Sequence, residues 1–183
     1  MRKELPVRKR LRLQGYDYSS NGAYFVTFCV ENRHEILGQI VGSGFHVRPH
    51  ENSGQAFVAL TDIGIEIKKS IEYVCKNTEN LEIPKYVIMP NHVHMIVFLN
   101  AVGHGSPTLQ SVVGRIKSYT AKRWSEMCGS KYQTFWQDRF HDRIIRNEEE
   151  YWQKWHYQKW HYIDKNPVKW AEDKYYVTQE DKF

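Results

Sequence analysis

The stretch YVIMPNHVHMIVFL, residues 86–99, decides the fold of this chain. Its β-branched and aromatic residues predict two β-strands, at residues 83–89 and 92–99, with a break at the proline-asparagine pair between them. Side chains alternate between the two faces of a sheet along a strand, so His92 and His94 point to the same face. Two neutral imidazoles side by side form half of a site for a divalent cation.

Strands and helices alternate on both sides of this stretch. Alternating apolar residues predict strands at 23–30 and 142–145. Helical periodicity, with Thr61 and Thr108 as capping residues, predicts helices at 62–75 and 109–127. A C-terminal helix is expected from residue 147 to NPVKW at 166–170. Residues 42–56 are polar and glycine-rich, and we interpret them as an exposed excursion in which His46 and His50 are surface residues. The element order predicts an α+β, ferredoxin-like sandwich, with an antiparallel sheet, helices on one face and an added C-terminal helix.

The composition limits the possible classes of protein. A chain of 183 residues suits one domain, and its formal charge of +5 with 14% aromatic residues is compatible with a nucleic-acid partner. No apolar run is long enough for a membrane span, and the basic N-terminus lacks the apolar segment of a secretory signal. Three cysteines without C-x-x-C spacing argue against a zinc ribbon and favour a reducing cytoplasm.

Tyr119 is the first candidate for a nucleophile that works with the histidine pair. It lies at the border of the apolar stripe of the 109–127 helix, where we expect its hydroxyl to face the sheet. Arg115, Lys122 and Arg123 lie within one helical turn of it, and we expect these cations to attract a phosphate and to ease ionisation of the phenol. A cation on the histidines and a tyrosine nearby suit attack on a phosphodiester.

The histidine pair has other possible interpretations. The purely structural alternatives are that the two histidines lie on a half-exposed strand without a functional role and that the tyrosine is an ordinary residue at the edge of a core. A zinc hydrolase of the metallo-β-lactamase kind needs an aspartate soon after the pair, where this chain has Met95 and Ile96. An amidohydrolase barrel needs about 250 residues, more than this chain has.

Several segments together resemble a known family. PNHVH followed by the helix GRIKSYTAKRW is similar to the single-tyrosine HUH transposases. GYDYSSNGAYFVTFCVENR, LTDIG, FWQDRFHDRIIRNEEEY and YIDKNPVKW resemble the branch called REP-associated tyrosine transposases. The resemblance covers most of residues 13–170, apart from the excursion and a direct repeat of QKWHY at 153–157 and 158–162, which we interpret as a local duplication.

The resemblance implies an activity and a set of site residues. His92 and His94 would bind Mg²⁺ or Mn²⁺, and Tyr119 would attack single-stranded, hairpin-forming (REP-like) DNA to give a 5′-phosphotyrosine intermediate and a free 3′-hydroxyl. The candidate DNA contacts are basic residues of the N-terminal arm and of the tyrosine helix: Arg8, Lys9, Arg10, Arg12, Arg115, Lys117, Lys122 and Arg123.

One position departs from the family pattern. Family members often carry a third metal ligand, Gln or Asn, one helical turn after the tyrosine, and here that position is Arg123, which cannot ligate a cation. Another side chain would then supply the ligand, or DNA and water would complete the shell. The candidate side chains are Gln137, Asp138, His141 and Asp142.

The resemblance also implies a domain organisation. We expect a basic arm at 1–22, an HUH catalytic domain at 23–146 and a C-terminal helix and tail at 147–183. The expected protein is a monomer or homodimer in a prokaryotic cytoplasm, associated with the nucleoid and not with a membrane. The alternatives are a non-catalytic binder of single-stranded nucleic acid, as a domesticated or decayed copy, and a small zinc hydrolase.

Overall fold

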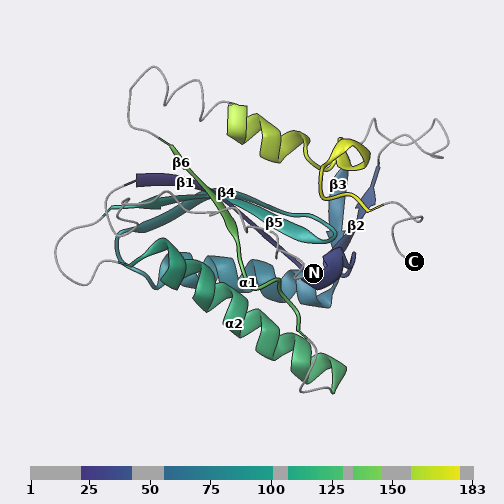
Figure 1. Cartoon of the computed structure of the whole chain (residues 1–183), viewed down its shortest axis with the longest axis horizontal. Helices are drawn as coiled ribbons and strands as arrows, with labels where there is room; N and C mark the ends of the chain where they lie inside the picture. Colours follow the sequence, from purple (N-terminus) through teal and green to yellow (C-terminus); the bar gives the residue numbers. More distant parts are fainter. Residues whose placement is uncertain (1–21, 43–55, 101–106, 130–133, 146–157, 178–183) are drawn as a thin grey trace, which may run out of the picture.

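An antiparallel four-stranded sheet with the strand order β4-β5-β1-β6 forms the centre of the molecule (Figure 1). The computed structural model describes residues 22–42, 56–100, 107–129, 134–145 and 158–177. The strands of the central sheet are β1 (Gly22–Cys29), β4 (Leu81–Ile88), β5 (His92–Leu99) and β6 (His141–Ile145).

Two helices, α1 (Asp62–Lys76) and α2 (Leu109–Cys128), cover one face of this sheet, and the helical residues 158–165 lie over the other (Figure 1). A separate two-stranded sheet pairs β2 (Gly38–Val41) with β3 (Phe57–Leu60). Short 3₁₀ turns, η1 (Glu31–Arg33) and η2 (Trp170–Glu172), complete the elements. The predicted α+β sandwich is confirmed.

Most element boundaries agree with the sequence patterns. Thr61 caps α1 by accepting from the Gly64 amide, and Thr108 caps α2 in a reciprocal pair with Ser111. The C-terminal helix ends at residue 165, before the Asn-Pro pair, as the proline predicts. Its expected start at 147 and the histidines of the excursion lie outside the described residues. In the described part of the chain, no helix has the length and apolar character needed to cross a membrane.

The main core lies between the sheet and helices α1 and α2. Alternate residues of β1 and β5, such as Val26, Phe28, Val93 and Met95, are buried there. The expected apolar stripes of the helices supply the other side: Ile63, Ile67, Ile71 and Val74 from α1 with Leu109, Val112, Val113 and Ile116 from α2. The sequence spacing predicts that the α2 stripe continues through Thr120 and Trp124 to Met127, but the stripe ends earlier, because Met127 is exposed. Because odd and even positions of a strand face opposite ways, this packing turns His92 and His94 to the other face.

The LTDIG segment fixes the turn that precedes the histidines. A Cβ atom on Gly64 would lie 2.1 Å from the Leu37 carbonyl oxygen, so only glycine lets α1 approach this backbone. The Leu37 amide in turn donates to the Pro90 carbonyl at 2.9 Å, and the Asn91 carbonyl accepts from Val30 at 2.9 Å. The first turn of α1 therefore supports the loop that leads into β5.

Candidate metal centre and tyrosine site

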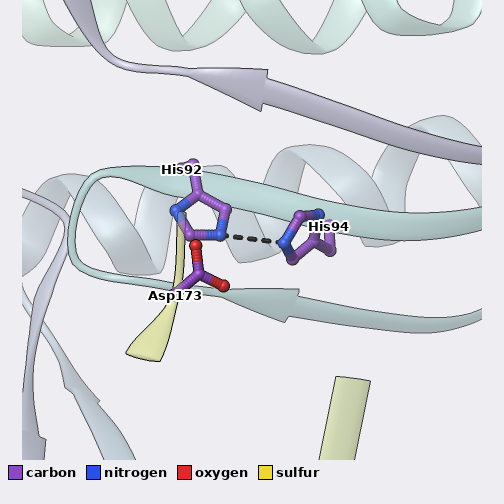
Figure 2. Close-up of side chains that lie close together, drawn as sticks. All are labelled: His92, His94 and Asp173. Atoms are coloured by element: carbon purple, nitrogen blue, oxygen red, sulfur yellow. Dashed lines mark hydrogen bonds between the residues drawn. The ribbon is translucent and has the colours of Figure 1, made fainter. Parts of the chain in front are cut away.

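His92 and His94 form a buried pair on the sheet face opposite α1 and α2. Their side chains are 0% and 1% exposed, and their Nε2 atoms are 3.0 Å apart (Figure 2). Phe25 stacks on His94 with ring centroids 5.1 Å apart, and Tyr175 lies against His92 at 4.6 Å. The predicted orientation of both imidazoles to one face is confirmed, but the pair is buried and not half-exposed.

Asn91 fixes the protonation of His92. Its amide nitrogen donates to the carbonyl oxygens of Arg33 at 3.2 Å and Tyr175 at 2.8 Å, so its side-chain oxygen must face His92 Nδ1, at 2.8 Å. An amide oxygen only accepts, and Nδ1 therefore carries the proton. The lone pair of His92 is left on Nε2, which faces His94.

Thr27 performs the equivalent task for His94. The two residues are cross-strand neighbours in β1 and β5, and the Thr27 hydroxyl lies 2.7 Å from His94 Nδ1. A hydroxyl can accept from Nδ1–H, and this tautomer leaves the lone pair of His94 on Nε2. With a cation bound, the residues behind the imidazoles can therefore hold both lone pairs toward one point, as in protein metal sites. Without the ion, one Nε2 donates to the other across the 3.0 Å contact.

Burial keeps both histidines neutral. Desolvation lowers the pKa of His92 to about 3, partly opposed by the nearby Asp173 carboxylate. Desolvation also lowers the pKa of His94 well below its usual range, and the charge of His92 adds to the effect. Neutral imidazole is the form that binds a metal, so the pair is ready for a cation at neutral pH.

Asp173 completes the group. One ligand atom from each of His92, His94 and Asp173 lies within 4.8 Å of the others (Figure 2). Neighbouring ligands of an octahedral ion with bonds of about 2.1 Å are about 3.0 Å apart, which matches the separation of the two Nε2 atoms. Two imidazoles and a carboxylate are a donor set for divalent cations. These residues therefore fit a divalent cation.

Asp173 was not among the expected ligands. Among the described residues, no other group of three His, Cys, Asp or Glu side chains has this geometry, so Asp138, His141 and Asp142 do not join the pair. Asp173 follows η2, far from the histidines in sequence and outside the family segments, and no spacing pattern could have identified it.

Tyr162 lies beside this group. Its hydroxyl donates to Asp173 Oδ2 at 3.1 Å, and its ring meets that of His94 edge-on, with centroids 5.3 Å apart. Burial, followed by the negative charge of Asp173, raises the pKa of Tyr162. The ammonium group of Lys159, one turn earlier, lies 5.3 Å from the centroid of the tyrosine ring.

Asn166, one helical turn after Tyr162, is 3% exposed. Its amide nitrogen donates to the same Asp173 oxygen at 3.2 Å. Its side-chain oxygen is buried without a hydrogen-bond partner in the part of the chain that the structure describes. Such an oxygen is a further potential ligand beside the group.

Tyr119 is not brought to the histidines. It lies on α2, on the other side of the sheet, is 46% exposed and donates to Glu66 Oε2 of α1 at 3.0 Å. The hydroxyl does not face the sheet as expected. The charge of Arg123 does lower the pKa of Tyr119, as expected, but the hydrogen bond to Glu66 outweighs it, so the pKa is raised overall. Arg123 is held by Glu66 and Glu126.

The expected DNA-contacting residues of α2 share the location of Tyr119. Arg115 donates to Thr78 at 2.8 Å, and Lys117 is half-buried and donates to the Gln137 carbonyl at 2.6 Å. Lys122 is exposed near Glu126. The structure therefore puts these basic residues on the face away from the histidines. Arg8, Lys9, Arg10 and Arg12 lie outside the described residues.

The missed residues did have a partial sequence signal. Tyr162 and Asn166 both belong to YIDKNPVKW and are four residues apart, as are Tyr119 and Arg123, but only Asn166 is the amide that the family pattern has at this position. The QKWHY repeat obscures this signal, because its second copy ends at Tyr162, the residue that begins YIDKNPVKW.

The fold and site define a class: an α+β protein with a buried pair of neutral histidines, a carboxylate and a tyrosine on the sheet face opposite its two main helices. Residues 18–163 match the family described as "Transposase IS200 like". The chain belongs to this family of transposases, as the sequence motifs predicted.

Two individual proteins are similar to the chain. An uncharacterized protein of Haemophilus influenzae (strain ATCC 51907 / DSM 11121 / KW20 / Rd) is 28% identical over an alignment of 188 positions, which covers 93% of each chain. A solved structure described as a REP-associated tyrosine transposase bound to a REP hairpin has a similar fold, with a TM-score of 0.55 and 24% identity, over 89% of this chain and 76% of the other.

Proposed function

We propose that this transposase cleaves and rejoins single-stranded, hairpin-forming DNA of the REP type, with Tyr162 as its nucleophile. The observation that carries the proposal is the hydrogen bond from the Tyr162 hydroxyl to Asp173, because the same carboxylate belongs to the group with His92 and His94. Tyr162 replaces Tyr119, the candidate from the sequence, and Asn166 then stands where the family pattern has its amide ligand.

The proposed reaction is a transfer of a phosphoryl group to the phenol. His92, His94 and Asp173 would hold Mg²⁺ or Mn²⁺, with the Asn166 oxygen as a further ligand, and the ion would polarise the phosphodiester. The Tyr162 oxygen forms a bond to phosphorus while the bond from phosphorus to the 3′-oxygen breaks. Asp173 Oδ2 accepts the phenol proton, and the leaving 3′-oxygen takes a proton from water.

The products account for both cleavage and rejoining. A 5′-phosphotyrosine ester stores the energy of the broken bond, so attack by a 3′-hydroxyl on the ester restores a phosphodiester and frees the phenol. On this proposal the catalytic unit extends beyond residue 146, because Tyr162, Asn166 and Asp173 all follow it.

The experiment is to incubate the full chain with Mn²⁺ and a labelled pool of DNA hairpins that carry randomised single-stranded flanks. We expect an SDS-resistant adduct, lost in EDTA, whose nucleotide maps by mass spectrometry to the peptide that contains Tyr162. An adduct on another tyrosine would overturn the assignment. DNA binding without any adduct would favour the non-catalytic alternative.

A further inference from the structure

A pocket of about 680 Å³ opens beside the tyrosine site, between the end of the C-terminal helix and the segment around η2. Tyr162, Asn166 and Asp173 form part of its wall. A group in this pocket would therefore touch the proposed nucleophile and the proposed metal ligands. Its volume is within the range of about 300–1,000 Å³ typical of ligand pockets.

The remaining wall of the pocket is rich in lysine. Lys165, Lys169 and Lys174 line it, together with Gln158 and His161. Asp173 accepts hydrogen bonds from its neighbours. Lys169 and Glu172 form an exposed ion pair at 3.5 Å, which is weak enough for a phosphate to replace Glu172 as the partner of Lys169. Cations of this kind bind the phosphates of a nucleic acid, and amide and imidazole groups can pair with base edges.

We propose, building on the function proposed above, that this pocket receives the nucleotide next to the scissile phosphate. The lysines contact the backbone phosphates, and Gln158 and His161 contact the base. The single strand then crosses the histidine face of the sheet and does not run along α2, where the sequence had suggested its contacts.

The test measures binding of fluorescein-labelled single-stranded dT 12-mers to the full chain by anisotropy, in EDTA and over a range of NaCl concentrations. Each phosphate contact that is lost lowers the slope of log affinity against log salt by about 0.7 for single strands. We therefore expect Lys165→Gln/Lys169→Gln to reduce the slope by about 1.4. The matched control Lys68→Gln/Lys76→Gln, which removes two exposed lysines of α1, should leave the slope unchanged.

A second measurement locates the strand directly. A dT 12-mer that contains 4-thiothymidine, irradiated with the wild-type chain, should crosslink to peptides from residues 158–174. Unchanged salt dependence in the folded pocket variant, or crosslinks only to α2, would overturn the proposal.

The two proposals fail separately. A reduced slope without an SDS-resistant adduct in the wild type would keep the pocket and reject the catalytic function. A Tyr162 adduct in the wild type, together with an unchanged slope in the pocket variant, would keep the catalytic function and reject the pocket.

Discussion

The two faces of the central sheet carry different chemistry. On one face, Val93 and Met95 of β5 pack against α1 and α2 in a core of apolar side chains. On the other face, the alternating residues His92 and His94 meet Thr27 and the C-terminal segment in a polar group whose two histidines are buried. One strand therefore contributes to both the main core and the candidate reaction centre through alternation alone.

The tyrosines of the two faces differ in the same way. Tyr119 is tied to Glu66 in an exposed network between two helices, whereas Tyr162 is tied to Asp173 beside the neutral histidines. Each has a carboxylate partner and a raised pKa. The position relative to the sheet distinguishes Tyr162, the candidate nucleophile, from Tyr119 on the surface. The presence of basic neighbours in the sequence does not distinguish them.

Among substitutions of the metal-binding group, that of a histidine should have the largest effect. We expect His94→Gln to reduce adduct formation about a thousandfold, since metal-assisted charge stabilisation contributes several kcal/mol, and to weaken Mn²⁺ binding measured by electron paramagnetic resonance. The control His34→Gln changes an exposed histidine and should alter neither. Normal Mn²⁺ binding by His94→Gln would separate this residue from the metal.

Substitutions on the face of the sheet that α1 and α2 cover should lower the stability of the protein without changing metal binding. Ile67 is 0% exposed in the main core, so Ile67→Ala should lower the free energy of unfolding in urea by about 2–5 kcal/mol. Ile65 on the same helix is 41% exposed, and Ile65→Ala should change the free energy of unfolding by less than about 0.5 kcal/mol. Loss of Mn²⁺ binding by folded Ile67→Ala would show that the faces are not separable.

Asp173→Asn should have an intermediate effect. It keeps the shape of the side chain but removes the charge, so we expect Mn²⁺ binding, measured by calorimetry, to weaken by about 10–100-fold. Glu172→Gln, at an exposed neighbour, should bind Mn²⁺ normally. Equal affinities of the two variants would remove Asp173 from the candidate site.

The metal-free protein should become less stable in acid because of the buried histidines. Burial lowers the pKa of His92 to about 3 from an ordinary value of 6.5, so between these values the unfolded state binds the proton and the folded state does not. Stability therefore falls as the pH falls through this window, by at most about 1.4 kcal/mol per pH unit for each such group. In EDTA, the free energy of unfolding in urea should depend less on pH for His92→Gln than for the wild type. An equal pH dependence of the two proteins would contradict the argument that burial lowers the pKa of His92.

Much of the fold follows from local patterns in the sequence. Alternation identified β5 and the common direction of His92 and His94, and the caps Thr61 and Thr108 marked the starts of α1 and α2. Helical periodicity shows which side of a helix is apolar, but it does not show which face of the sheet the helix covers. Tyr119 was misplaced for that reason.

The rest of the candidate site depends on tertiary structure. Asp173 reaches the histidines because the chain turns back over the sheet after the C-terminal helix, with Ile163 packed on Ile96 and Phe25. That path depends on contacts between distant segments, which have no periodic signature in the sequence. The four-residue spacing of Tyr162 and Asn166 can be read from the sequence, but only the path of the chain shows that both residues lie beside the histidines.

The most direct test of the account compares Tyr162→Phe with Tyr119→Phe in the adduct assay with Mn²⁺ and the hairpin pool. Each substitution removes one hydroxyl and leaves the ring, so both variants should fold. We predict that Tyr162→Phe forms no SDS-resistant adduct, whereas Tyr119→Phe forms it at the wild-type rate. An adduct that survives in Tyr162→Phe and disappears in Tyr119→Phe would contradict the account.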